Sequence, residues 1–273
     1  MYKFMRFPGF KARALTFSYD DGTVFDKRLV EIFDKYGLKG TFNLNSGLFG
    51  VGRRLSLDEL HELFDNSTHE IAVHGRMHLS LPSYPISAAT ADVLLDRLEL
   101  EKCFGGIIRG MAYAYGTYSD EVIDALAKCG IVYSRITRPT RTFDIPTDWL
   151  ALQPTCHHRD PELMTLADKF LETPTNRTRL TMPPRLFYVW GHSYEFNDSD
   201  NWHVIENFCE KLSGNVEIYY ATNIELYEYI KAFEALVFSA DGKTVKNPTA
   251  TDVYTSLGAK ETLIPAGKTV TLD

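Results

Sequence analysis

Residues 14–44, ALTFSYDDGTVFDKRLVEIFDKYGLKGTFNL, contain one complete strand–helix–strand unit. The run 14–19 predicts a strand, and the amphipathic stretch from Val24 to Tyr36, closed by Gly37, predicts a helix. Residues 41–44 predict the next strand. Because strands joined through a helix usually pair in parallel, this stretch predicts the start of a parallel α/β sheet.

The same alternation continues along the chain. Strand-like runs follow at residues 70–73, 131–134, 186–190 and 216–220. Amphipathic stretches that predict helices follow at residues 87–104, 119–129, 204–212 and 225–233. Ser56 and Glu59 have the spacing of a capping box and predict the start of a further helix. Six or seven such units predict an α/β fold, a distorted (β/α) barrel of about seven parallel strands in residues 1–235.

The last part of the chain, residues 236–273, has a different pattern. Turn signals at Asp241-Gly242 and at Pro265-Ala266-Gly267 separate short runs such as 253–257 and 269–272. A segment of this length is too short to form a core of its own. We therefore expect a small C-terminal β extension that packs on the barrel.

The composition excludes several classes of protein. The formal net charge over 273 residues is -7, whereas general binding to nucleic acid or to an anionic membrane needs a positive surface. No apolar run is long enough to cross a bilayer, and the N-terminus lacks the features of a signal peptide. The sequence as given predicts a cytoplasmic protein, unless a leader has been removed. Four cysteines without a CxxC pair favour buried thiols over a disulfide or zinc–cysteine site. The oligomeric state is not predicted.

Polar residues that could carry chemistry follow three of the predicted strands. Asp20 and Asp21 come directly after the first strand, His74 and His78 after a later strand, and His192 after another. Taken alone, each feature has an ordinary structural explanation: a strand-end turn, a chance spacing of two histidines, or a buried imidazole bonded to a carbonyl. Because the carboxyl ends of parallel strands gather at one face, the combination predicts a single site.

The residue types at this site suit a divalent metal ion. Histidines four residues apart lie on one face of a helical turn, so the rings of His74 and His78 can reach one ion. One carboxylate and two imidazoles leave open positions on the metal, as a catalytic site needs.

With these residues identified, the chain resembles the polysaccharide deacetylase family, also called the NodB-homology family. The stretch 16–22, TFSYDDG, is similar to the first family motif, and 69–78, HEIAVHGRMH, is similar to the second. The resemblance implies hydrolysis of N-acetyl groups, or of O-acetyl groups, on a carbohydrate with release of acetate. It implies that Asp20 is the general base and that Asp21, His74 and His78 bind one divalent ion. Zinc is the default ion, with cobalt, nickel or iron as alternatives.

The third family motif is incomplete in this chain. The stretch 112–116, AYAYG, has alanine where the family has an arginine that pairs with the base. Arg135 or Arg138 could supply that cation, and Arg135 is preferred because it directly follows the strand 131–134. Arg109 is a weaker candidate. Tyr115 is implied to donate its backbone N–H to the oxyanion, and Tyr113 is expected to contact the substrate.

The remaining motifs are short. The resemblance implies that Trp149 helps to wall the acetyl pocket, that Asp148 orients His192, and that His192 is the general acid. The stretch 156–159, CHHR, and Glu195 match no family motif. We assign them to loop structure, with the lining of the substrate cleft as the alternative.

Two other functions remain open at this point. The first is a metal-dependent hydrolase of another non-peptide C–N bond, because the motif arginine is missing. The second is a catalytically silent carbohydrate-binding protein. Activity on acetylated glycans separates the first from a deacetylase, and loss of Asp20 would have favoured the second.

Overall fold

The computed structural model describes residues 2–172 and 181–272. Its largest feature is a parallel sheet with the strand order β6-β5-β4-β3-β2-β8-β7, in which β9 pairs with the first half of β2. Its strands are β2 (Arg13–Asp20), β3 (Gly40–Leu44), β4 (Glu70–Val73), β5 (Gly110–Ala112), β6 (Tyr133–Arg135), β7 (Cys156–His157), β8 (Arg185–Gly191) and β9 (Ile218–Tyr220). The sheet is strongly curled, which confirms the predicted distorted barrel.

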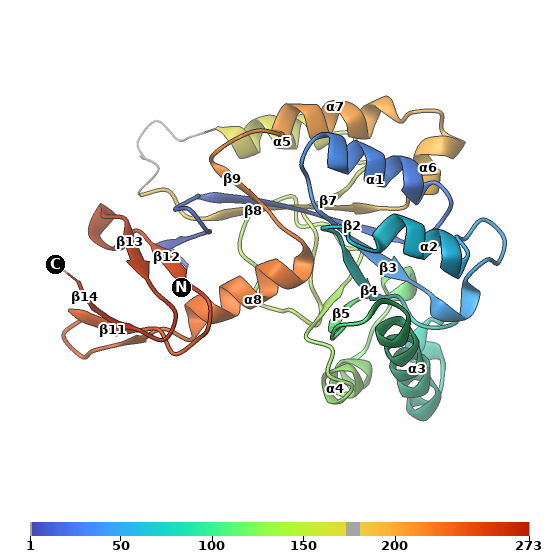
Figure 1. The fold of residues 1–273 in the computed structure, drawn as a ribbon, viewed down its shortest axis with the longest axis horizontal. Coiled ribbons are helices and arrows are strands. Elements are labelled where there is room, and N and C mark those ends of the chain that lie inside the picture. The colour runs from blue at the N-terminus through green and yellow to red at the C-terminus, as the bar shows by residue number, and fades with distance from the viewer. Residues whose placement is uncertain (1, 173–180, 273) are drawn as a thin grey trace.

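Helices surround this sheet. They are α1 (Asp26–Lys35), α2 (Leu57–Phe64), α3 (Ile86–Phe104), α4 (Asp120–Lys128), α5 (Leu163–Leu171), α6 (Ser193–Asp198), α7 (His203–Leu212) and α8 (Asn223–Glu234). Figure 1 shows α1, α5 and α7 on one side of β2 and β8, and α8 on the other. The predicted capping box is confirmed, since Ser56 and Glu59 exchange hydrogen bonds at the start of α2.

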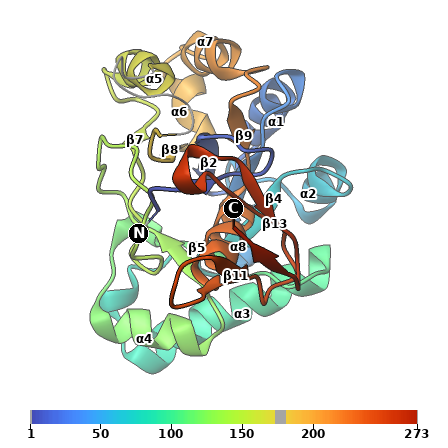
Figure 2. The same cartoon turned by 90° about the vertical axis from the view of Figure 1, so that its left-hand side faces the viewer.

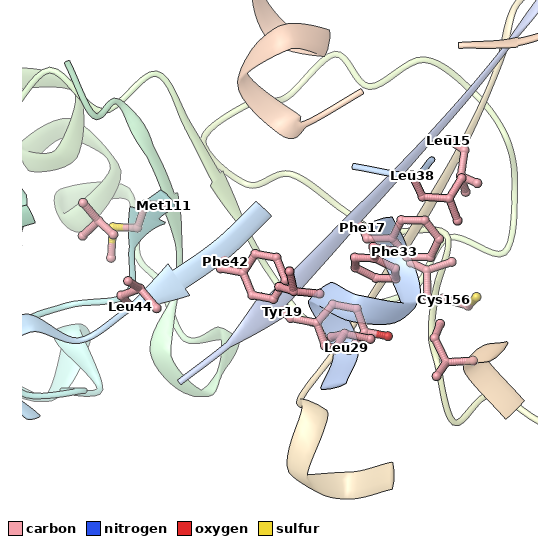
Figure 3. Packing of buried hydrophobic residues seen from close by; sticks show 14 of the residues in the cluster. Leu15, Phe17, Tyr19, Leu29, Phe33, Leu38, Phe42, Leu44, Met111 and Cys156 are labelled. Atoms are coloured by element: carbon pink, nitrogen blue, oxygen red, sulfur yellow. The ribbon is translucent and has the colours of Figure 1, made fainter. Parts of the chain in front are cut away.

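Alternation along β2 separates the two faces of the sheet. Leu15, Phe17 and Tyr19 face outward into the larger hydrophobic core, where Phe17 packs on Phe33 of α1 at a ring-centroid distance of 4.5 Å. Figure 3 shows this packing. The alternate residues of β2, from residue 16 to residue 20, are polar and equally buried. Because successive side chains of a strand point to opposite faces, these polar groups line the concave interior of the curled sheet.

Helix α8 fills the lower part of this interior. Asn223, its first residue, accepts a hydrogen bond from Thr16 Oγ1 at 2.9 Å and donates one to the Tyr188 hydroxyl at 2.7 Å. Figure 2 shows α8 near the centre, with α1, α2, α3, α4, α5 and α7 around it. The open end of the interior therefore lies at the carboxyl ends of the strands.

An irregular segment extends the sheet from β6 toward β7. Arg135 forms an isolated parallel bridge with Leu152, and Thr155 N donates to Tyr188 O of β8 at 2.8 Å. Two details of the predicted elements change here. The strand expected at 131–134 is β6 at Tyr133–Arg135, and the segment expected to be a loop at 156–159 begins with β7. Both differences concern short strands, β6 and β7, whose pairing depends on distant residues.

The C-terminal residues form short antiparallel strands. One sheet has the order β10 (Val237–Phe238), β11 (Thr244–Lys246) and β14 (Thr269–Thr271). The other has β12 (Val253–Thr255) between β1 (Met5–Arg6) and β13 (Thr262–Ile264). Val245, Val253 and Ile264 share one buried cluster with Ile230 and Phe233 of α8. The division of the chain at residue 235 stays a prediction.

Within the described residues, no helix combines the length and the apolar character that crossing a bilayer requires.

Candidate active site

Asp20 ends β2 at the open end of the barrel interior. Its side chain is 3% exposed. Asn43 Nδ2 of β3 donates to Asp20 Oδ1 at 2.8 Å, and the Arg135 guanidinium of β6 donates to Oδ2. His74 Nε2 and His192 Nε2 each lie 3.9 Å from the same Oδ2. Four strands thus bring one cation, one amide and two imidazoles to a single buried carboxylate.

Arg135 is the cation beside Asp20, for which the sequence left three candidates. Its guanidinium is fully buried, pairs with Asp20, and lies 4.3 Å from the centroid of the Trp190 ring. The other two candidate arginines lie elsewhere: Arg138 faces the side-chain amide of Gln153, and Arg109 pairs with Glu228 on the surface. The expected contact of Arg135 with Asp20 is therefore present.

The charge of Asp20 is set by opposing effects. Burial alone raises the pKa of this carboxyl group, because the charged form loses its hydration. The Arg135 guanidinium, together with His74 and His192, outweighs burial and lowers the pKa to about 2. Asp20 is consequently ionised at physiological pH.

Asp21 leaves the interior through a tight turn. Its φ angle is +80°, in the left-handed region that aspartate tolerates better than most residues. The turn places Asp21 Oδ1 at 3.6 Å from His78 Nε2 and at 3.0 Å from Arg54 NH2. The two neighbouring aspartates therefore have different surroundings: Asp20 faces the arginine in the interior, and Asp21 faces the second histidine.

The two histidines converge by a route that differs from the expected one. Residues 74–78 form a turn rather than a helical face, with φ of +80° at Gly75 and +55° at His78. A Cβ at Gly75 would lie 2.8 Å from Asp92 Oδ2, so this position also needs glycine for space. His74 Nδ1 lies 2.8 Å from Ala112 O and must donate to it. This hydrogen bond leaves His74 Nε2 without a proton and free to bind a metal.

Ligand atoms of Asp21, His74 and His78 all lie within 4.8 Å of one another. Their chemistry, one carboxylate and two imidazoles, suits zinc and similar divalent ions. The backbone carbonyl behind His74 supplies the outer hydrogen bond that metal-bound histidines normally have. The residues present thus fit one divalent ion, and the sequence predicted this set.

His192 follows β8 on the other side of Asp20. Its Nε2 also lies 4.0 Å from Asp21 Oδ2, and its Nδ1 lies 3.6 Å from Glu195 Oε2. Burial lowers the pKa of His192, but Glu195, Asp20 and Asp21 outweigh this effect and raise the pKa above its ordinary value. His192 is therefore suited to carry a proton near neutral pH.

Two residues expected at the site have other contacts in the structure. Asp148 was expected to orient His192, but its Oδ1 accepts from Ala151 N at 3.0 Å, and Glu195 is the carboxylate that faces His192 Nδ1. Trp149 was expected to wall the acetyl pocket, yet it packs in the lower core, 5.1 Å from the ring of Tyr227. The reason is that Trp149 O accepts from Ser134 N, which fixes this segment beside β6.

The two tyrosines of the third motif have opposite environments. Tyr113 is 1% exposed and donates its hydroxyl to Leu150 O at 2.8 Å, and its contact with a substrate stays a prediction. Tyr115 is 66% exposed, has a φ of +59°, and stands 4.6 Å from the ring of His78. The oxyanion role of its backbone N–H stays a prediction.

Sequence reasoning missed several residues around the site. Trp190 contacts Arg135 and also His157, whose ring centroid is 4.5 Å away. The alternation of β8 could have found Trp190, because residues 190 and 192 point to the same side of a strand. His157, His158 and Glu195 form a second group whose possible ligand atoms lie within 4.8 Å of one another. No short-range pattern joins residues 157–158 to residue 195.

One part of the chain matches a known protein family. Residues 8–134 match the family model described as polysaccharide deacetylase. The matched segment contains Asp20, Asp21, His74 and His78, whereas Arg135 and His192 lie beyond it. No curated protein is similar enough to the chain to count as a match.

Solved structures show the same fold at low sequence identity. The Xyl-CE4 domain of a multidomain xylanase, from the hindgut metagenome of Trinervitermes trinervoides, is 14% identical at a TM-score of 0.54, with 81% of this chain and 92% of that chain covered. The peptidoglycan deacetylase PdaC from Bacillus subtilis is 18% identical at a TM-score of 0.52, with coverages of 82% and 94%. A CE4 family pseudoenzyme from Bacillus anthracis is 16% identical at a TM-score of 0.50, with coverages of 81% and 66%. Two other matched chains are only about half covered, at 55% and 44% of their length.

Proposed function

Because residues 8–134 match the polysaccharide deacetylase family model, we propose that the chain is a metal-dependent hydrolase of acetyl groups on a carbohydrate. The preferred bond is the N-acetyl amide, with the O-acetyl ester as the alternative substrate. One observation carries the proposal: an ionised Asp20, paired with Arg135, lies beside both a three-residue group that can hold a metal ion and a third imidazole, that of His192. The likeness to a pseudoenzyme means that the fold alone does not establish catalysis.

In this proposal Asp21, His74 and His78 hold the divalent ion. When bound, such an ion lowers the pKa of its water and polarises the acetyl carbonyl. Asp20 does not need to be a ligand, because its Oδ2 is already engaged by Arg135. That contact fixes the carboxylate and keeps it ionised, so that Asp20 accepts the proton of the attacking water.

His192 supplies the other proton. Its Nε2 faces the two aspartates, and its raised pKa extends to higher pH the range in which the ring carries a proton. As the C–N bond of the acetamide breaks, His192 Nε2 gives its proton to the leaving amine. The products are acetate and an amino sugar. The backbone N–H of Tyr115 is the proposed donor to the oxyanion.

Acetate release from a panel of glycans tests the activity. The purified protein, supplied with Zn²⁺, is assayed on a chitin oligomer for N-acetyl and on acetylxylan for O-acetyl hydrolysis. We expect acetate from the first and less or none from the second. Binding of both glycans without any acetate would instead support the silent carbohydrate-binding alternative.

Metal content tests the ligand set independently of activity. We expect about one divalent ion per chain in the wild type. His74→Ala should lose most of this ion, and the double variant His74→Ala/His78→Ala should not bind it at all. His61→Ala is the matched control, because His61 lies on the surface of α2 beside Asp65. Equal metal content in the wild type and the double variant would contradict the assignment.

A further inference from the structure

Glu195 is surrounded by three imidazole rings. Its Oε2 lies 3.1 Å from His157 Nε2, 3.1 Å from His158 Nε2 and 3.6 Å from His192 Nδ1. The Glu195 side chain is 15% exposed and the His158 side chain 1%. Among the described residues, both ring nitrogens of His158, His192 Nδ1 and Glu195 Oε2 are buried atoms without a hydrogen-bond partner. Buried polar atoms without partners are rare in proteins, so this cluster calls for an explanation other than packing.

Local structure explains how these residues meet. His192 is the N-cap of α6 and Glu195 its third residue, the spacing of a capping box, which lets a glutamate side chain return toward the N-cap. The chain already uses this spacing at the starts of α2 and α8. Here the N-cap residue carries an imidazole instead of a hydroxyl. The carboxylate of Glu195 therefore returns to the ring of His192.

The two histidines approach from β7. His157 pairs with Trp190 of β8 in parallel register, and His158 follows it. A Cβ at position 191 would lie 1.9 Å from His158 Nδ1, so only glycine lets this ring lie against β8. Stacking on Tyr19 and Phe196, at 5.7 Å and 4.0 Å, fixes the ring of His158. Both rings are thus held in place before any ligand binds.

Two functions fit such a cluster, and the tautomer of His157 separates them. Two histidines and one glutamate could hold a second metal ion. His157 Nδ1, however, accepts a hydrogen bond from Arg159 N at 3.1 Å. A neutral His157 must then carry its proton on Nε2, the atom that faces Glu195. A protonated nitrogen cannot bind a metal, so the contact favours an electrostatic clamp of imidazole N–H groups around the carboxylate.

We propose that Glu195 is a positioning residue for His192, and that His157 and His158 hold its carboxylate. Glu195 keeps a proton on His192 Nδ1, so that Nε2, which faces Asp20 at 3.9 Å, is the atom that exchanges a proton with the substrate. In the step itself the Nε2–H bond breaks, an N–H bond forms on the leaving amine, and His192 remains neutral with Nδ1–H. The inference rests on the proposed role of His192.

A spectroscopic test reads the tautomer without any turnover. ¹⁵N-histidine NMR of the Zn²⁺-loaded protein, above the pH at which His192 loses its charge, distinguishes Nδ1–H from Nε2–H, and a His192→Gln sample identifies the signal. We expect Nδ1–H in the wild type and a shift toward Nε2–H in Glu195→Ala. Asp198→Asn is the control, because Asp198 lies on the same helix and pairs with Arg53 on the surface. A wild-type His192 with Nε2–H overturns the proposal.

Kinetics and metal content complete the test. Loss of an outer-shell partner typically costs 10- to 100-fold, so we expect Glu195→Gln to lower kcat by roughly that factor with KM nearly unchanged. Glu195→Asp should restore part of kcat, and Asp198→Asn should match the wild type.

All variants should hold about one ion per chain. Two ions in the wild type and one in Glu195→Gln would instead establish a second metal site. A wild type that releases no acetate contradicts the proposed function, while the tautomer still decides this inference.

Discussion

The interior of the barrel contains two polar layers that are built differently. The upper layer, at the open end, consists of Asp20, Asn43, His74, Arg135 and His192. Asp20 meets one guanidinium and two imidazoles there. Within the described residues, Arg135 Nε and NH1, Asn43 Oδ1 and His192 Nδ1 are buried without a hydrogen-bond partner.

The lower layer, around the start of α8, is satisfied. Glu70 Oε1 accepts from the Tyr133 hydroxyl at 2.6 Å, and Oε2 accepts from Thr41 Oγ1 at 2.8 Å and Ile224 N at 2.9 Å. Asn223 bonds to Thr16 and Tyr188 on its two side-chain atoms. In the described part of the chain, none of the buried side-chain polar atoms of Glu70 or Asn223 lacks a partner.

The difference leads us to expect that the lower layer serves the fold and the upper layer the proposed chemistry. A satisfied network rigidifies the structure around it, whereas unpaired buried donors and acceptors cost free energy. We attribute the cost in the upper layer to the proposed function of its residues. We therefore expect substitutions in the upper layer to change activity or charge balance, and those in the lower layer to change stability.

The largest effect is expected at the proposed base. Asp20→Asn should lower kcat by about 10²- to 10⁴-fold, because it removes a proton acceptor. Metal content should stay at the wild-type level, since Asp20 is not in the ligand set, whereas Asp21→Asn should reduce it. Turnover and metal analysis on both variants check this. Equal metal loss in the two variants would show that their roles are misassigned.

The next effect concerns the buried ion pair. Arg135→Met leaves the charge of Asp20 in the interior without its cation, which should cost about 3 kcal/mol of the free energy of unfolding near pH 7. The pKa of Asp20 is about 2 in the wild type and should rise in this variant. The loss of unfolding free energy should therefore become smaller as the pH falls and Asp20 becomes neutral. Denaturant unfolding at several pH values measures this loss.

Two further variants make the Arg135 test specific. The double variant Arg135→Met/Asp20→Asn should recover much of the stability, because no buried charge remains. Arg109→Met, which breaks a surface pair with Glu228, should change stability by less than about 1 kcal/mol. A double variant no more stable than Arg135→Met would show that packing, not charge, explains the loss.

The lower layer should show a pH dependence of the opposite sign. Burial raises the pKa of Glu70 to about 7, although its three hydrogen bonds oppose this. The folded state therefore binds this proton more tightly than the unfolded chain. The contribution of Glu70 protonation to the free energy of unfolding is complete below the ordinary pKa of glutamate. It is lost as the pH rises through 7, and the loss is at most roughly 3 kcal/mol. Glu70→Gln should remove this decline between pH 4.5 and 8, as chemical unfolding can measure. Unchanged pH dependence in Glu70→Gln would place the titration elsewhere.

The smallest effect is expected at the start of α8. Thr222 caps this helix in a capping box with Glu225, and Thr222→Ala should cost about 1 kcal/mol. Ser56→Ala, at the equivalent box of α2, should cost a similar amount and is the matched control. Neither variant should change kcat. A drop in kcat confined to Thr222→Ala would show that the lower layer also positions the upper one.

Local patterns were enough to predict much of the fold. Apolar alternation, helix caps and glycine stops fall within a few residues of one another, so they indicate β2, β3, α1 and α2 directly from the chain. β7, at Cys156–His157, was not predicted. It is only two residues long, and its pairing with β8 depends on residues more than thirty positions away. Short strands have too little sequence to show a period.

The sequence by itself determined the residue types of the site and their order along the chain. Asp20, Asp21, His74, His78 and His192 each follow a strand, and parallel strands bring their carboxyl ends together. The tertiary structure decided which partner each group has. Arg135 reaches Asp20 because the curl of the sheet brings β6 and β2 together. That contact joins residues far apart in sequence, and no local period encodes it. Glu195 lies only three residues after His192, but its meeting with His157 and His158 depends on the pairing of β7 with β8.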